Sequence, residues 1–183
     1  MTSYTITDDK QIDDAREIFG GLAAMNDVLE EATGTDNVAA VAPADLYAFA
    51  LGHADPAASK VEAALKTSAP IRAAFHDLLS CASDFHVPRA MAAASDDIDV
   101  REGADCRISI QPSEAAPGQV YVIVELTQAG SRDPKVMHLM GAGDVYHRTE
   151  LPEFYDGIAQ LIVEVTSEII TLLQDPDTEV FLK

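Results

Sequence analysis

Residues 152–174, PEFYDGIAQLIVEVTSEIITLLQ, decide the fold because the segment fits two secondary structures. As one long helix, it collects its apolar side chains on one face: Ile158, Leu161, Ile162, Val165, Ile169, Leu172 and Leu173. As a strand through Val165, it alternates apolar and polar residues, and Ser167 then caps a short helix over Glu168–Gln174. Gly157 and the β-branched content favour the strand. The strand predicts a small β-sandwich, whereas the long helix predicts a helical layer on a sheet.

The residues on either side of this segment have the pattern of β-strands. From Cys106 onward, short runs either alternate apolar and polar residues or are rich in β-branched residues. Pro117-Gly118 and the run from Gly141 to Asp144 separate them as turns. The expected strands are 107–111, 120–126, 136–140, 145–151 and 178–182.

The first half of the chain carries helical signals instead. Residues 8–31 repeat apolar side chains at helical spacing. Three shorter helices are expected within 43–86, and their starts are marked by Pro43, Asp55-Pro56 and Ser68-Ala69-Pro70. Gly52 ends the first of the three.

These patterns predict an α+β protein with an N-terminal helical unit followed by a C-terminal β-rich, sandwich-like module. The helical unit is expected over residues 1–86 and the β-rich module over 106–183. Residues 87–105 are acidic and poorly patterned, which indicates a linker between the two.

Charge restricts the partners. The chain of 183 residues has 31 acidic against 12 basic side chains, a formal net charge of -19. Such a surface repels phosphate backbones and anionic membranes, so we expect no nucleic-acid or membrane binding. A basic protein partner is the functional interpretation, and a merely solubilising surface is the alternative. With no secretory signal and no apolar run of about 20 residues, a cytoplasmic location is expected. The oligomeric state stays open.

One stretch of the helical unit resembles a known family. Residues 45–56 read DLYAFALGHADP, and the pattern continues through VEAAL at 61–65 to PIRAAF at 70–75. This stretch is similar to the N-terminal helical domain of bacterial anti-sigma factors. The resemblance implies a transcription regulator whose partner is a sigma factor. Zinc-binding members use a His and a Cys-x-x-Cys, but the aligned positions here are Ala64, Ser68 and Ile71, so the resemblance is to a variant without zinc.

The same stretch supplies candidate partner-binding residues. Aromatic side chains lie beside carboxylates at Asp45, Tyr47, Phe49 and Asp55. Interfaces favour aromatic anchors at the centre and charges at the rim. Tyr47 and Phe49 differ by about 200° around a helix, so we expect one to pack in the core and the other to be the candidate anchor. The alternative is that both pack in the core, one against each neighbouring helix.

The histidines and cysteines predict neither a metal site nor a nucleophile. His76, Cys81 and His86 are spaced by five residues, which places them on different helix faces. His138, Tyr146 and His147 lie on two neighbouring expected strands and are candidates for binding a small ligand. No catalytic or cofactor motif is present. The expected function is therefore a non-enzymatic regulatory interaction, and a small-ligand-binding β module is the alternative.

Overall fold

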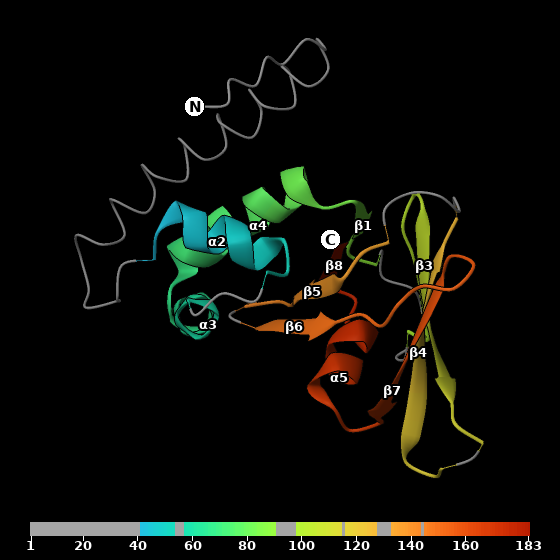
Figure 1. The fold of residues 1–183 in the computed structure, drawn as a ribbon. Helices are drawn as coiled ribbons and strands as arrows, with labels where there is room; N and C mark the ends of the chain where they lie inside the picture. Colours follow the sequence, from blue (N-terminus) through green and yellow to red (C-terminus); the bar gives the residue numbers. More distant parts are fainter. Residues whose placement is uncertain (1–40, 54–56, 91–97, 115, 128–132, 144) are drawn as a thin grey trace, which may run out of the picture. The chain divides into compact units, whose positions relative to one another are not determined.

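In the computed structural model, the described residues are 41–53, 57–90, 98–114, 116–127, 133–143 and 145–183. The chain divides into two compact units. The described part of the first unit holds three helices, and the second unit holds eight described strands and one helix (Figure 1). The predicted α+β class, with helices first and strands after, is confirmed. The helix expected over 8–31 and the candidate residue Asp55 lie outside the described residues.

The helices of the first unit follow the predicted punctuation. They are α2 (Pro43–Ala50), α3 (Ala58–Thr67) and α4 (Ala69–Ala82). Gly52, which follows α2, has a φ of 74°, a left-handed conformation that glycine adopts readily after a helix. Their shared core is apolar, and its largest fully buried side chains are Leu46, Phe49, Leu65, Phe75 and Leu79. In the part of the chain that the structure describes, no helix is long and apolar enough to cross a membrane.

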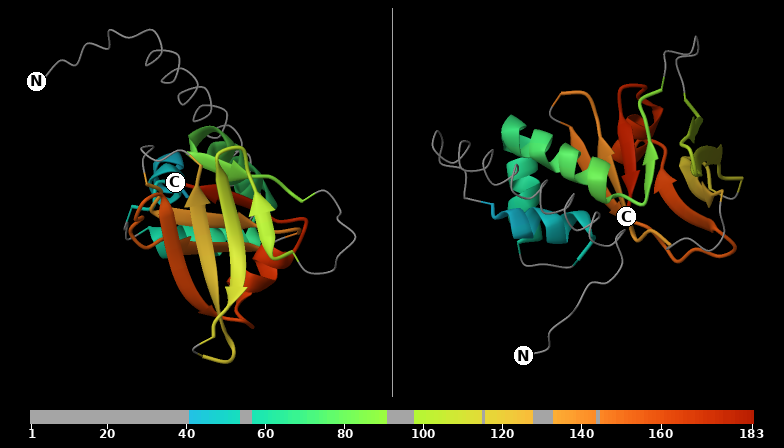
Figure 2. Two further views of the ribbon diagram at one scale, coloured as in Figure 1. Left: turned by 90° about the vertical axis from the view of Figure 1, so that its right-hand side faces the viewer. Right: turned by 90° about the horizontal axis from the view of Figure 1, so that it is seen from above.

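The second unit, here called the β module, contains two four-stranded antiparallel sheets. One sheet has the order β1-β8-β5-β6, built from β1 (Phe85–Val87), β8 (Glu179–Leu182), β5 (Val136–Met140) and β6 (Tyr146–Glu150). The other has the order β2-β3-β4-β7, built from β2 (Val100–Glu102), β3 (Cys106–Pro112), β4 (Gln119–Leu126) and β7 (Ile158–Glu164). The left view of Figure 2 looks onto this second sheet, with β7 at one edge.

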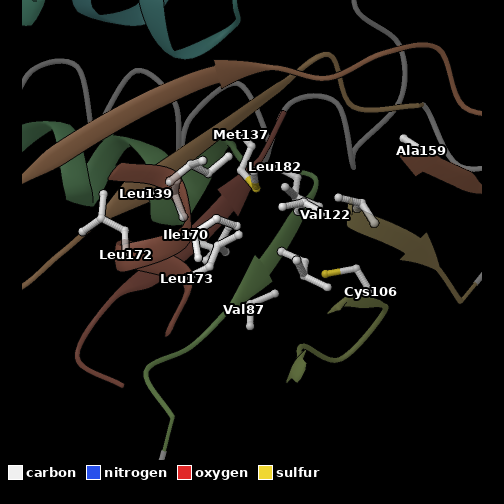
Figure 3. Close-up of a cluster of buried hydrophobic side chains, with 14 of the residues drawn as sticks. Val87, Cys106, Val122, Met137, Leu139, Ala159, Ile170, Leu172, Leu173 and Leu182 are labelled. Atoms are coloured by element: carbon white, nitrogen blue, oxygen red, sulfur yellow. The ribbon is translucent and has the colours of Figure 1, made fainter. Parts of the chain in front are cut away.

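The two sheets share one hydrophobic core. Alternate residues of β4 point into it, namely Val120, Val122 and Val124. Helix α5 (Glu168–Gln174) adds Ile170, Leu172 and Leu173 to the same core (Figure 3). The predicted sandwich-like arrangement therefore has a helix between β7 of one sheet and β8 of the other.

The segment 152–174 adopts the strand-plus-helix structure. Strand β7 runs from Ile158 to Glu164, one residue short of the predicted end, and α5 has the predicted bounds. Ser167 stands at the N-cap position of α5, but its side chain makes no capping hydrogen bond. The apolar face predicted for the strand comprises Ala159, Leu161, Val163 and Val165. The first three face the core, whereas Val165 lies beyond the end of β7 and is 48% exposed.

Both ends of the expected linker 87–105 differ from that prediction. Val87 belongs to β1, together with Phe85 and His86 from the end of the expected helical unit, and β1 pairs with β8. Val100–Glu102 forms β2 and pairs with β3. Arg101 of β2 is buried. A charged residue can be buried here because the apolar part of the arginine side chain packs inside and its guanidinium binds several backbone carbonyls. The acidic, poorly patterned sequence around it gives no sign of this burial.

Candidate functional site

The outer face of the β2-β3-β4-β7 sheet, opposite to the core, carries exposed apolar side chains. Ile162 on β7 is 59% exposed and Ile158 is 45% exposed. Two apolar side chains of β4 extend this surface: Tyr121 lies opposite Ile162, and Ile123 lies opposite Gln160, which stands between the two isoleucines. Both β4 side chains are partly exposed. The face of a sheet that contacts solvent usually carries polar residues. The apolar side chains at these positions depart from that pattern.

A tight turn adds an aromatic ring to this surface. Tyr155 and Ile158 exchange two backbone hydrogen bonds, 2.9 and 3.0 Å long, around Asp156 and Gly157. Both turn residues have positive φ, 49° and 78°, as the type I′ hairpin turn requires. Directly paired residues project their side chains to the same face. Tyr155, 81% exposed, therefore lies beside Ile158.

These residues are defined as the outer strip: Tyr121, Ile123, Tyr155, Ile158 and Ile162. Acidic residues lie along its border. Glu125 pairs with Ile158, Glu164 ends β7, and Asp156 is in the turn. The neighbouring cation is Arg107, which lies opposite Glu125 and forms an ion pair of 3.7 Å with Glu102. The border is therefore net negative, in keeping with the charge of the whole chain.

Sequence reasoning missed the outer strip although its signal was present. Ile158 and Ile162 fall on the outward parity of the strand defined by Ala159 and Leu161. Their spacing of four residues also fits a helix face, so the same two residues supported the long-helix alternative. Only the pairing of β7 with β4 assigns them to a surface.

The helical candidate residues separate into different roles. Phe49 is buried, and its ring centroid lies 5.8 Å from that of Phe75. The carboxylate of Asp45 accepts a hydrogen bond from the backbone N–H of Ala42, 3.3 Å long, at the start of α2. Tyr47 is half-buried and is therefore the more exposed aromatic of the pair.

The candidate ligand residues of the β module do not form one site. The Nδ1 of His138 lies 2.8 Å from the hydroxyl of Tyr146, and both side chains are buried. His147 pairs with Leu139 rather than with His138, so its side chain leaves the opposite face of the sheet. There its Nδ1 lies 3.1 Å from the carboxylate of Glu168 on α5. The one-residue offset in register is the reason that the two histidines separate.

The residues considered for metal binding lie on two different secondary-structure elements. His76 and Cys81 are on α4, and His86 is on β1, where its ring stacks on Phe181 with centroids 4.6 Å apart. The Nε2 of His86 lies 3.2 Å from Glu179. Among the described residues, no group of three or more His, Cys, Asp and Glu side chains is arranged to hold a metal ion.

A cavity of about 600 Å³ lies beside the chain that connects β6 to β7. Its walls combine apolar side chains, including Leu151 and Phe154, with the charged residues Lys135, Asp133, Glu150 and Glu153. None of the three candidate ligand residues lines it.

Comparisons of the chain with protein-family models, with curated proteins and with solved structures gave no match. The geometry of the described residues therefore carries the functional proposal.

Proposed function

We propose that this protein is a non-enzymatic interaction protein that binds a basic protein partner through the outer face of the β2-β3-β4-β7 sheet. The observation that carries the proposal is the outer strip, where Tyr155, Ile158 and Ile162 expose apolar surface within one continuous sheet face. Contiguous apolar patches with a polar border are typical of protein-binding sites. The two tyrosines fit the aromatic composition of interface centres.

The chemistry of the partner follows from charge. The border of the strip is acidic at Glu125, Asp156 and Glu164, and the chain has a net charge of -19. A second copy would bring the same charge, which disfavours self-association. A partner that presents basic residues around an apolar centre gains both burial and attraction.

A sigma factor is the specific partner that the resemblance of residues 45–75 to anti-sigma factors suggests. The protein would then act as a regulator of transcription. In that form of the proposal the helical unit supplies a further contact, and half-buried Tyr47 is its aromatic anchor.

The test uses a synthetic peptide, Lys-Thr-Val-Thr-Val-Thr-Lys, and its charge-reversed form with Glu in place of Lys. NMR titration of the isotope-labelled full chain measures both affinities. We expect the basic peptide to bind, with an affinity that falls as salt is added, and the acidic peptide not to bind. Ile162→Asp should weaken binding at least about tenfold, because it places a charge in the apolar centre.

Val145→Asp is the matched control. Val145 is also an exposed apolar residue, 41% exposed, and it lies outside the outer strip. Both variants add one negative charge, so a purely electrostatic attraction would strengthen in both. Equal affinity of the basic peptide for the two variants, or equal binding of the acidic peptide, would contradict the proposal.

A small-ligand-binding function is the second candidate, and the cavity beside the β6–β7 connection favours it. Its volume of about 600 Å³ lies within the range of known ligand pockets. Phe154 and Leu151 offer apolar contact, and Lys135 offers a cation among the carboxylates of Asp133, Glu150 and Glu153. Native mass spectrometry of the protein purified from its own cell tests this, since a bound metabolite that Lys135→Ala releases would support it.

A further inference from the structure

The free edge of β7 suggests how a partner binds. In an antiparallel pair, backbone groups alternate between bonding the neighbour and pointing away from it. Leu126 donates to the carbonyl of Gly157 at 2.8 Å, and Val165 donates to that of Gly118 at 2.9 Å. Odd-numbered residues of this segment therefore bond to β4. The N–H and C=O groups of the even-numbered residues point to the outer edge.

Two neighbours cover the ends of this edge. Ile158 is bonded to Tyr155 through both backbone groups. At the other end, the carbonyl of Glu164 accepts from the N–H of Ser167 at 3.0 Å. Between these points, the edge presents both backbone groups of Gln160 and Ile162 and the N–H of Glu164. The described strands place nothing on this side of β7.

Strand β7 also lacks the protection usual for such edges. Proteins shield edge strands by keeping them very short or by placing Lys and Pro on them. Among the described edge strands, β1 and β2 have three residues each, and β6 carries Arg148. Strand β7 has seven residues, IAQLIVE, with no basic residue and no proline. Ile162 belongs to both the free edge and the outer strip. One bound segment can therefore hydrogen-bond to the edge and pack on the strip.

We infer that the partner supplies an extended segment that adds to β7 as a further antiparallel strand, an inference that rests on the proposed function. Residues of the segment opposite Ile162 and Gln160 exchange backbone hydrogen bonds with them and place their side chains on the outer face. The residue opposite Ile162 is apolar and packs on the outer strip. The residue opposite Glu164, two positions earlier, is Lys or Arg and pairs with its carboxylate.

The peptide described above matches this order, and backbone N-methylation tests it. Two methylated forms are compared, one modified on the valines and one on the threonines. Only one of these sets can direct its N–H groups at β7. The valines are the residues placed opposite Ile162 and Gln160. We therefore expect the valine-methylated form to lose at least about tenfold in affinity and the threonine-methylated form to bind like the parent.

A protein variant gives an independent test. Gln160→Pro removes an N–H that points away from β4, a position where edge strands tolerate proline. Gln160→Thr keeps that N–H and is the control. We expect Gln160→Pro to lose peptide binding at an unchanged melting temperature, whereas Gln160→Thr keeps it.

The outcomes separate this inference from the proposed function. If both methylated forms bind like the parent while Ile162→Asp abolishes binding, the partner docks on the face, and strand addition is wrong although the proposed function stands. If the basic peptide fails to bind the wild-type chain, both are wrong. A dimer by light scattering that Ile162→Asp dissociates would show that a second copy occupies the edge and would overturn the inference.

Discussion

The guanidinium of Arg101 donates a hydrogen bond to the backbone carbonyl of Asp175 at 2.8 Å, and this contact joins β2 of one sheet to the chain between α5 and β8 of the other. The same side chain donates to the carbonyls of Leu173, Pro88 and Thr178. Burial lowers the pKa of Arg101, and the nearby Asp175 raises it in part. The side chain is a buried connection between the two sheets.

Replacing Arg101 with Met should lower the free energy of unfolding of the β module by about 2–4 kcal/mol. The cost arises because several buried carbonyls lose their donor, and each unpaired group costs about 1–3 kcal/mol. Urea denaturation followed by tyrosine fluorescence measures the change. Arg107→Met is the control, because Arg107 is exposed and forms only a surface ion pair, so a change within about 0.5 kcal/mol is expected. Equal losses in the two variants would contradict a structural role for Arg101.

Cys106 should make the protein less stable at alkaline pH. Burial raises the pKa of its thiol to about 11, and the adjacent Asp105 adds to the effect. The ordinary thiol pKa is about 8.5, so between these values the unfolded chain loses a proton that the folded chain keeps. The stability that the thiol contributes is complete below the ordinary pKa and falls by about 2–3 kcal/mol as the pH rises to about 11.

The measurement is the free energy of unfolding from pH 8 to pH 11 for the wild type, Cys106→Ala and Cys81→Ala. Subtracting the Cys106→Ala curve removes the effect of lysines and tyrosines. Cys81 is exposed, so its variant should keep the wild-type slope. A Cys106→Ala slope that equals the wild-type slope would show that the buried thiol has no such effect.

Gly103→Ala should lower the melting temperature more than Gly141→Ala. An added Cβ at Gly103 would lie 2.4 Å from the backbone carbonyl oxygen of His86, which cannot move without disturbing β1. At Gly141 the nearest atom, 2.7 Å away, is a terminal methyl of Leu172, which can rotate. Overpacking of a rigid contact costs about 1–3 kcal/mol. Thermal scans of both variants test the order, and a larger loss for Gly141→Ala would contradict it.

Phe49→Ala and Tyr47→Ala should differ in their effect on the helical unit. Phe49 is 1% exposed and packs on Phe75, so its truncation should cost about 3–5 kcal/mol. Tyr47 is half-buried, and its truncation should cost about 1 kcal/mol or less. Helix melting followed by circular dichroism measures both. A loss of comparable size in the two variants would place both rings in the core and remove Tyr47 as a candidate anchor.

The sequence by itself determined the elements whose signals are local. Pro43 and Gly52 bound α2, and the residues Glu168–Gln174 form the predicted helix. Alternation in 158–165 placed Ala159, Leu161 and Val163 on one face of a strand, and these three contact the core. Propensity, capping and periodicity act over a few residues, so a single sequence carries them.

The tertiary structure decided everything that depends on which strands pair and in what register. It inserts β8 between β1 and β5, turns His138 and His147 to opposite faces, and buries Arg101. It also leaves β7 at the edge of its sheet and exposes Ile158 and Ile162, whose spacing in the sequence fitted a helix as well as a strand. Pairing between distant strands is set by the burial of the whole core, and a register change of one residue reverses every side chain, so no local pattern specifies it.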